Sequence, residues 1–203
     1  MNEYLRPASL PATTQAAEGL PRRRWSVAEI REMMAKGIIL EDERFELIGG
    51  EVVPMSPKGN RHEVVKQALQ QHWFPLTAGS PACLITETTL YISDDEFREP
   101  DFLFWPRAIP LKNVTAASAL LIVEVADSSL GYDLGSKAHA YAALGLPELW
   151  VIDANTLVTA IHRHPTPSGY PKPREAGPGE LWEPHLAPHL GVRLSDLGLA
   201  PAD

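Results

Sequence analysis

The strongest constraint on the fold is a short apolar run with one carboxylate inside it, Leu121-Ile122-Val123-Glu124-Val125. Such a run is typical of a β-strand that is covered on both faces by other parts of the protein. Burying an unpaired carboxylate costs on the order of several kcal/mol. Glu124 must therefore lie at a cleft, bind a metal ion or, as the simpler alternative, form a structural salt bridge.

The elements expected around this strand indicate an α/β (α+β) fold with a mixed sheet and helices packed on it. A capping box at Ser26–Glu29 predicts an N-terminal helix, and Gly49-Gly50 predicts the turn of a hairpin over residues 44–55. Further along we expect a helix over residues 61–74, strands over 83–92, 101–105 and 120–125, a helix over 134–144, and strands over 149–152 and 157–162.

The length and composition suit one globular domain over residues 25–203, after a flexible extension over residues 1–24 that is rich in Ala, Pro, Thr and Arg. No apolar run reaches the roughly 18 residues of a membrane-spanning helix. The N-terminal residues lack the apolar stretch of a secretory signal, and the single Cys83 fits a reducing compartment. We therefore expect a cytoplasmic protein without membrane contact.

A second carboxylate favours a metal site. Asp101 opens the apolar segment Phe102-Leu103-Phe104 and lies 23 residues before Glu124, enough for a return strand. Neighbouring strands lie about 4.8 Å apart. Asp101 and Glu124 can therefore share one Mg²⁺ or Mn²⁺ ion, which prefers hard oxygen ligands.

Lys137 could complete this site from the helix that follows the Glu124 strand. Its ammonium could point back toward the same cleft, orient or help deprotonate a water, and stabilise charge on a phosphate. Tyr141, one helical turn further on, could support Lys137. A solvated helix lysine and a packed tyrosine are the simpler alternatives.

Two further residues could belong to the site. Glu46, between Phe45 and Leu47 on a short strand, could supply another acid, although strand alternation could equally point it outward. His62, at the start of the second helix, could contact phosphate or accept a proton, or be an ordinary surface histidine.

The net charge of −8 lowers the expectation of nucleic-acid binding, because phosphate contacts depend on clustered Lys and Arg. Catalytic carboxylates can nevertheless coexist with a locally basic rim, and a metal ion neutralises part of the acidity. The sequence has no Gly-x-Ser-x-Gly elbow, phosphate-binding loop, dinucleotide fingerprint or paired-cysteine motif.

Several blocks of the sequence resemble the Uma2 family, also described as DUF820. The first runs from Arg44 to Val53 and on through Met55-Ser56-Pro57 to His62. The resemblance spans residues 25–197. The later blocks, in matching order, are Pro100-Asp101, Val123-Glu124-Val125, Asp133-Leu134, Lys137, Tyr141 and Gly145–Asp153.

The resemblance implies a restriction-endonuclease-like fold of the PD-(D/E)XK nuclease superfamily. It implies that Asp101 and Glu124 are metal ligands, with the backbone carbonyl of Val125 as a further ligand, and that Glu46 is an accessory acid. The superfamily lysine two residues after the acidic strand residue is absent, since Ala126 stands there. In Uma2-like proteins this role moves to the next helix, where this chain has Lys137.

The leading hypothesis is therefore a Mg²⁺-dependent endonuclease that hydrolyses phosphodiester bonds of nucleic acid, DNA more than RNA. Cutting both strands needs two sites, which predicts a homodimer. The alternatives are a catalytically inactive binding or regulatory module with the nuclease fold, which the negative charge favours, and a metal-dependent hydrolase with another substrate.

Overall fold

A six-stranded sheet forms the centre of the molecule in the computed structural model, which describes residues 23–40, 42–55 and 57–202. The strand order is β10-β9-β8-β7-β6-β3; β7 and β8 are parallel, and every other neighbouring pair is antiparallel. The strands are β3 (Ala82–Thr86), β6 (Phe102–Pro106), β7 (Leu121–Ala126), β8 (Glu148–Asp153), β9 (Thr159–Arg163) and β10 (Arg174–Ala176).

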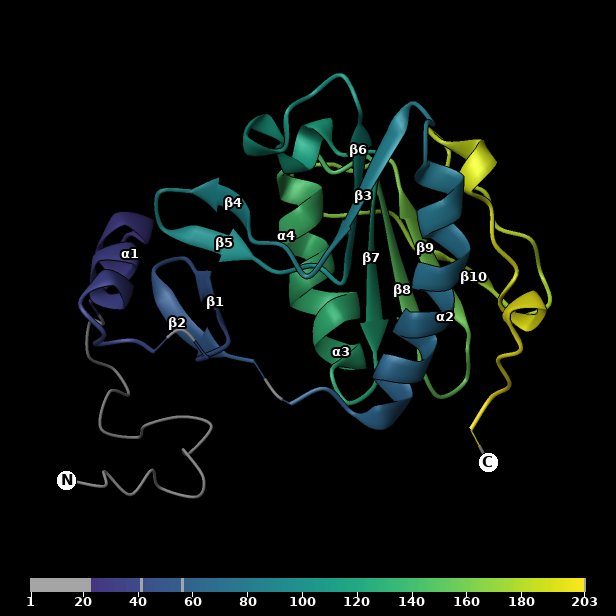
Figure 1. Ribbon diagram of the computed structural model, residues 1–203, viewed down its shortest axis with the longest axis horizontal. Helices are drawn as coiled ribbons and strands as arrows, with labels where there is room; N and C mark the ends of the chain where they lie inside the picture. The colour runs from purple at the N-terminus through teal and green to yellow at the C-terminus, as the bar shows by residue number, and fades with distance from the viewer. Residues whose placement is uncertain (1–22, 41, 56, 203) are drawn as a thin grey trace.

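Helices cover both faces of this sheet (Figure 1). Helix α2 (Asn60–Thr77) and the C-terminal segment lie on one face. The other face is covered by α3 (Leu130–Tyr132), the π-helix η4 (Asp133–Lys137) and α4 (Ala138–Ala143), which follow one another along the chain. Short 3-10 helices occur at η2 (Leu111–Asn113), η3 (Ala116–Ser118), η5 (Pro188–Leu190) and η6 (Leu194–Leu197).

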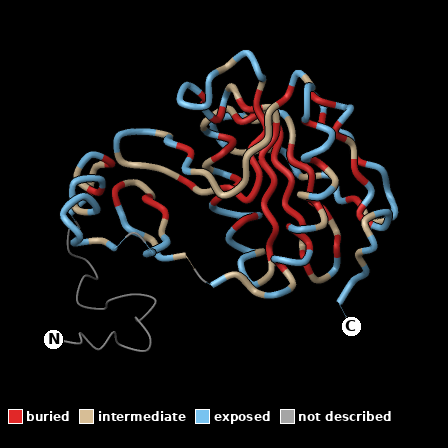
Figure 2. Tube along the Cα trace, viewed as in Figure 1, coloured by how far each residue is buried: buried red, intermediate tan, exposed pale blue. Residues whose placement is uncertain are grey.

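The core lies against the central strands, which are buried along their length (Figure 2). On the α2 face, Trp73 packs edge-to-face on Phe102 and Phe104, with ring centroids 5.2 and 5.1 Å apart. These large aromatic rings exclude water from the α2 face of β6 and β7, and a second apolar cluster, which includes Tyr141, covers the opposite face. The sheet is therefore a rigid support for the polar residues at its ends.

A second, four-stranded sheet of order β2-β1-β5-β4 lies beside the main sheet, with α1 (Val27–Ala35) packed on it (Figure 1). Its strands are β1 (Phe45–Ile48), β2 (Glu51–Pro54), β4 (Leu90–Ser93) and β5 (Glu96–Arg98). The predicted capping box of Ser26 and Glu29 and the Gly49-Gly50 hairpin are both confirmed. A Cβ at Gly50 would collide with Arg24, so glycine is required there.

The prediction of one strand over residues 83–92 is wrong. The chain forms β3, leaves the main sheet after Thr86 and enters β4 of the small sheet at Leu90. Glu87 lies at the break with φ +52°, a left-handed conformation that interrupts an extended strand. The predicted helix over residues 134–144 also begins earlier, at Leu130, and includes the π-helical turn η4.

The register of β6 and β7 brings the two predicted acids together. Phe102 pairs with Val123 at the end of the antiparallel ladder. Asp101 and Glu124 are each one residue beyond this pair, so they lie opposite each other where the strands part. Facing residues of an antiparallel pair are about 5 Å apart between Cα atoms.

Most of the extension predicted over residues 1–24 lies outside the described residues. Within the described part of the chain, no helix has both the length and the apolar character needed to cross a membrane.

Candidate active site

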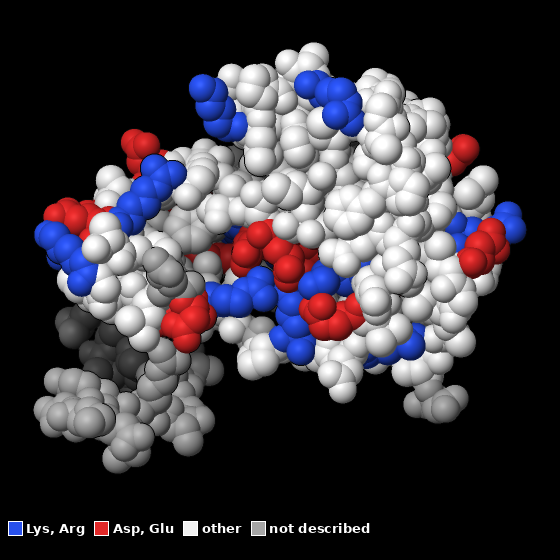
Figure 3. Space-filling view, viewed as in Figure 1, with Lys and Arg blue, Asp and Glu red and all other residues white. Residues whose placement is uncertain are grey.

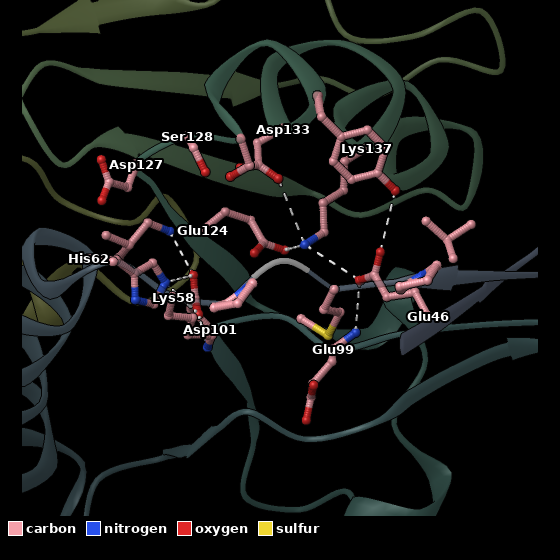
Figure 4. A pocket seen from close by; sticks show the side chains of 18 residues that line it. Glu46, Lys58, His62, Glu99, Asp101, Glu124, Asp127, Ser128, Asp133 and Lys137 are labelled. Carbon is pink, nitrogen blue, oxygen red and sulfur yellow. Dashed lines mark hydrogen bonds and ion pairs between the residues drawn. The ribbon is translucent and has the colours of Figure 1, made fainter. Parts of the chain in front are cut away.

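A pocket of about 340 Å³ lies where the small sheet meets the main sheet. Figure 4 shows its side chains converging from both sheets, from the start of α2 and from η4. The predicted site residues among its lining are Glu46, His62, Asp101, Glu124, Val125 and Lys137. Acidic and basic side chains are gathered in the middle of this face of the molecule (Figure 3). Six predicted residues from five separate segments of the chain therefore share one pocket.

Asp101 is held by donors from three segments. Its Oδ2 accepts a hydrogen bond from the backbone N–H of Val125 at 2.9 Å. Nε2 of His62 lies 3.1 Å from Oδ1 and 3.0 Å from Oδ2, and Nζ of Lys58 donates to Oδ1 at 2.8 Å. Burial by itself would raise the pKa of Asp101, but the hydrogen bond with His62 and the charge of Lys58 outweigh it and hold this pKa well below its usual range.

Glu124 faces Lys137 and Tyr141 on the other side of the site. Nζ of Lys137 lies 2.9 Å from Oε1 of Glu124, and the Tyr141 hydroxyl donates to the same oxygen at 3.0 Å. Burial raises the pKa of Glu124 to about 8, with Asp101 and Asp133 adding to the effect and Lys137 opposing it. Tyr141 does not line the pocket; it is buried behind Glu124.

Lys137 is the last residue of η4, a π-helical turn that winds more widely than an α-helix. π-helical turns occur frequently at functional sites. Besides Glu124, Nζ of Lys137 lies 3.6 Å from Oε1 of Glu46 and 3.9 Å from Oδ1 of Asp133. Burial would lower the pKa of Lys137, but these three carboxylates outweigh it and raise the pKa above its usual range. Lys137 therefore remains a cation.

Glu46 is buried, so its strand does not point it to solvent. Its Oε1 accepts a hydrogen bond from the backbone N–H of Glu99 at 3.1 Å. Its Oε2 lies 3.6 Å from NH1 of Arg98 and 3.3 Å from the Tyr132 hydroxyl. Glu46 thus links the small sheet to Lys137.

Lys58 is a pocket residue that the sequence does not predict; its Nζ donates to Asp101 and, at 2.5 Å, to Oε1 of Glu87. Lys66 donates to the same Glu87 oxygen at 3.0 Å. Burial would raise the pKa of Glu87, but these two lysines outweigh it and lower this pKa to about 2. Lys58 stands in a stretch rich in Pro and Gly, where a lysine gives no signal that separates it from an ordinary loop residue.

The donor set of Asp101 and Glu124 fits a hard divalent cation. Mg²⁺ takes only one or two protein carboxylates at many sites and completes its shell with water. Within the described residues, no group of three or more His, Cys, Asp or Glu side chains is arranged to hold a metal. The raised pKa of Glu124 also fits, because a bound cation would stabilise the ionised form of this buried carboxylate.

A solved structure supports the fold. A crystal structure described as "a putative nuclease belonging to DUF820" from Anabaena variabilis matches with a TM-score of 0.63 and 14% sequence identity, over 85% of this chain and 96% of that chain. The type IIG restriction endonuclease BpuSI has 18% identity over 62% of this chain and 15% of its own, with a TM-score of only 0.37. No curated protein matches the sequence.

The sequence itself matches a family described as "Putative restriction endonuclease" over residues 29–196, most of its length. This match confirms the resemblance of the sequence blocks, and the neighbouring fold confirms the restriction-endonuclease-like architecture. The chain belongs to the Uma2 family.

Proposed function

We propose that this protein is an endonuclease that hydrolyses phosphodiester bonds of nucleic acid, DNA in particular, with a divalent cation, Mg²⁺ or Mn²⁺. The observation that carries the proposal is the convergence of Asp101, Glu124 and Lys137 in one pocket of a Uma2-family fold. The nuclease description of the solved structure from Anabaena variabilis supports the same chemistry.

Asp101 and Glu124 would hold the cation, with the Val125 carbonyl as a further ligand. When bound, such a cation polarises the phosphate and lowers the pKa of a coordinated water. The N–H of Val125 and the ring of His62 orient the Asp101 carboxylate. The rigid end of β7 supports both acids.

Lys137 would act as a charged donor. Because three carboxylates surround it, its ammonium keeps its proton and cannot take one from water. It can orient the attacking water or stabilise the negative charge that develops on the phosphate. Glu46 positions Lys137 from the small sheet, and His62 supports Asp101.

The test is a cleavage assay on supercoiled plasmid and on single-stranded DNA and RNA, with Mg²⁺, Mn²⁺ or EDTA. We expect metal-dependent cutting by the wild type, little cutting by Asp101→Asn, and unchanged cutting by Asp196→Asn, which alters an exposed acid far along the chain. Cutting in EDTA, or full activity of Asp101→Asn, would contradict the mechanism.

The second candidate is a catalytically inactive binding or regulatory module. The net charge of −8 favours it, because strong phosphate binding needs excess positive charge. Retained metal binding without cutting of any tested substrate would support this candidate. The predicted homodimer belongs to the endonuclease proposal, and sedimentation of the protein with and without duplex DNA tests it.

A further inference from the structure

Lys58 places a positive charge directly on the proposed metal-binding carboxylate. It precedes α2, and its side chain is only 14% exposed. Figure 4 shows it beside Asp101 and His62, whereas Lys137 lies beside Glu124 and Glu46. The pocket therefore contains two lysines, each paired with a different proposed metal ligand.

The Asp101 carboxylate has little room for another partner. Lys58 and His62 contact Oδ1, and His62 and the N–H of Val125 contact Oδ2. A carboxylate offers about four lone-pair sites. A cation that binds Asp101 must therefore displace one of these donors.

Lys58 is the donor that can leave most easily. The N–H of Val125 belongs to the backbone of β7, and the His62 ring is buried on α2. Lys58 instead has a long, flexible side chain and a second acceptor, Glu87. Repulsion between the ammonium and a divalent cation favours the same exchange.

Two contacts keep Lys58 at the pocket after such an exchange: the ion pair of its side chain with Glu87, and the packing of its neighbour Gly59. Glu87 is itself held in place by its backbone N–H, which donates to the carbonyl of Asp101 at 3.3 Å, and by Lys66. A Cβ on Gly59 would collide with the carboxylate of Asp127, so the backbone next to Lys58 packs closely against the segment after β7. The Lys58 side chain can therefore move while the backbone that carries it stays in place.

We propose that a divalent cation displaces Lys58 from Asp101, and that the released ammonium, still bound to Glu87, binds a phosphate oxygen of the nucleic acid. An ammonium has three donors, so one remains directed at Glu87 while another reaches into the pocket. The inference rests on the proposed function. It makes the phosphate contact of Lys58 dependent on metal binding.

The test compares wild type with Lys58→Met in two binding measurements. Calorimetric titration with Mn²⁺ is expected to give about tenfold tighter binding in Lys58→Met, the size of one charge-assisted hydrogen bond. Fluorescence anisotropy with a DNA duplex in Ca²⁺ is expected to give about tenfold weaker binding in the same variant. If the role of Lys58 were purely structural, Lys58→Met would weaken both Mn²⁺ binding and DNA binding, or change neither.

Two variants serve as controls. Lys112→Met removes an exposed lysine that does not line the pocket, and it is expected to leave Mn²⁺ affinity unchanged. Lys58→Arg retains the charge and is expected to restore DNA binding toward the wild-type value. The inference is overturned if Lys58→Met binds Mn²⁺ with unchanged or weaker affinity, or if neither the wild type nor Lys58→Met binds Mn²⁺. It is also overturned if Lys58→Met binds DNA with unchanged affinity. Neither readout depends on cleavage, so a failed cleavage assay contradicts the proposed function separately.

Discussion

The Asp101 carboxylate accepts a hydrogen bond from the backbone N–H of Val125, with 2.9 Å between Oδ2 and the nitrogen. This contact continues the pairing of β6 and β7 with a side chain where the backbone ladder ends. It fixes Asp101 next to Glu124, the residue before Val125. The register of β6 and β7 therefore places Asp101 and Glu124 in the same site.

Replacing Lys137 with Met should slow cleavage by roughly 100-fold or more, the usual effect of losing a donor that stabilises transition-state charge. The reason is that Lys137 is the cation beside Glu124 and keeps its proton. Cleavage rates at saturating Mg²⁺ measure the effect. Lys112→Met, at an exposed position, is the matched control, and equal rates for the two variants would count against Lys137.

Replacing Glu46 with Gln should destabilise the fold by about 2 kcal/mol, because two buried cations, Arg98 and Lys137, each lose one of their charged partners. Urea unfolding gives the change in the free energy of unfolding. Glu175→Gln alters an exposed glutamate and should change stability by less than about 0.5 kcal/mol. If Glu46→Gln changes the free energy of unfolding as little as Glu175→Gln does, the buried contact with Arg98 does not contribute to stability.

Replacing Tyr141 with Phe should cost about 1 kcal/mol of stability, because Oε1 of Glu124 loses a buried hydrogen bond. The ring and its packing are retained. We expect slower cleavage as well, since Tyr141 helps to position Glu124. Urea unfolding and cleavage rates together test this role, and no change in either would show that Tyr141 only packs.

The wild type should lose stability as the pH falls below about 6.5, the pKa of an unfolded histidine. Burial lowers the pKa of His162, and neither ring nitrogen has a hydrogen-bond partner among the described residues. The unfolded chain therefore binds a proton at a pH where folded His162 does not, which favours unfolding.

Urea unfolding at pH 7.5 and 5.5 measures this effect of His162. His162→Phe should lose less stability between the two pH values than the wild type, whereas His189→Phe, at an exposed position, should behave like the wild type. An equal loss in all three proteins would mean that folded His162 accepts the proton without cost.

Much of the candidate site could be predicted because each residue left a local signal. Glu124 interrupts an apolar strand, Asp101 opens another, and Lys137 follows on the next helix. Gly49-Gly50 predicts the hairpin of the small sheet, and the pairing of β1 with β2 confirms it. These signals depend only on neighbouring residues.

The rest depends on contacts between distant segments. Glu87 interrupts the predicted strand because its φ is positive. The sequence gives no sign of this conformation, since positive φ is uncommon for residues other than glycine. Lys58 joins the site only because the start of α2 packs against the end of β7. The buried position of Glu46 likewise follows from the small sheet closing on η4.

The central claim is that Asp101 and Glu124 together hold one divalent cation, and a Mn²⁺ titration followed by electron paramagnetic resonance tests it most directly. We predict one bound Mn²⁺ per chain in the wild type and in Asp196→Asn, and loss of that ion in both Asp101→Asn and Glu124→Gln. Undiminished Mn²⁺ binding in either of these two variants, with the fold intact by circular dichroism, would contradict the claim.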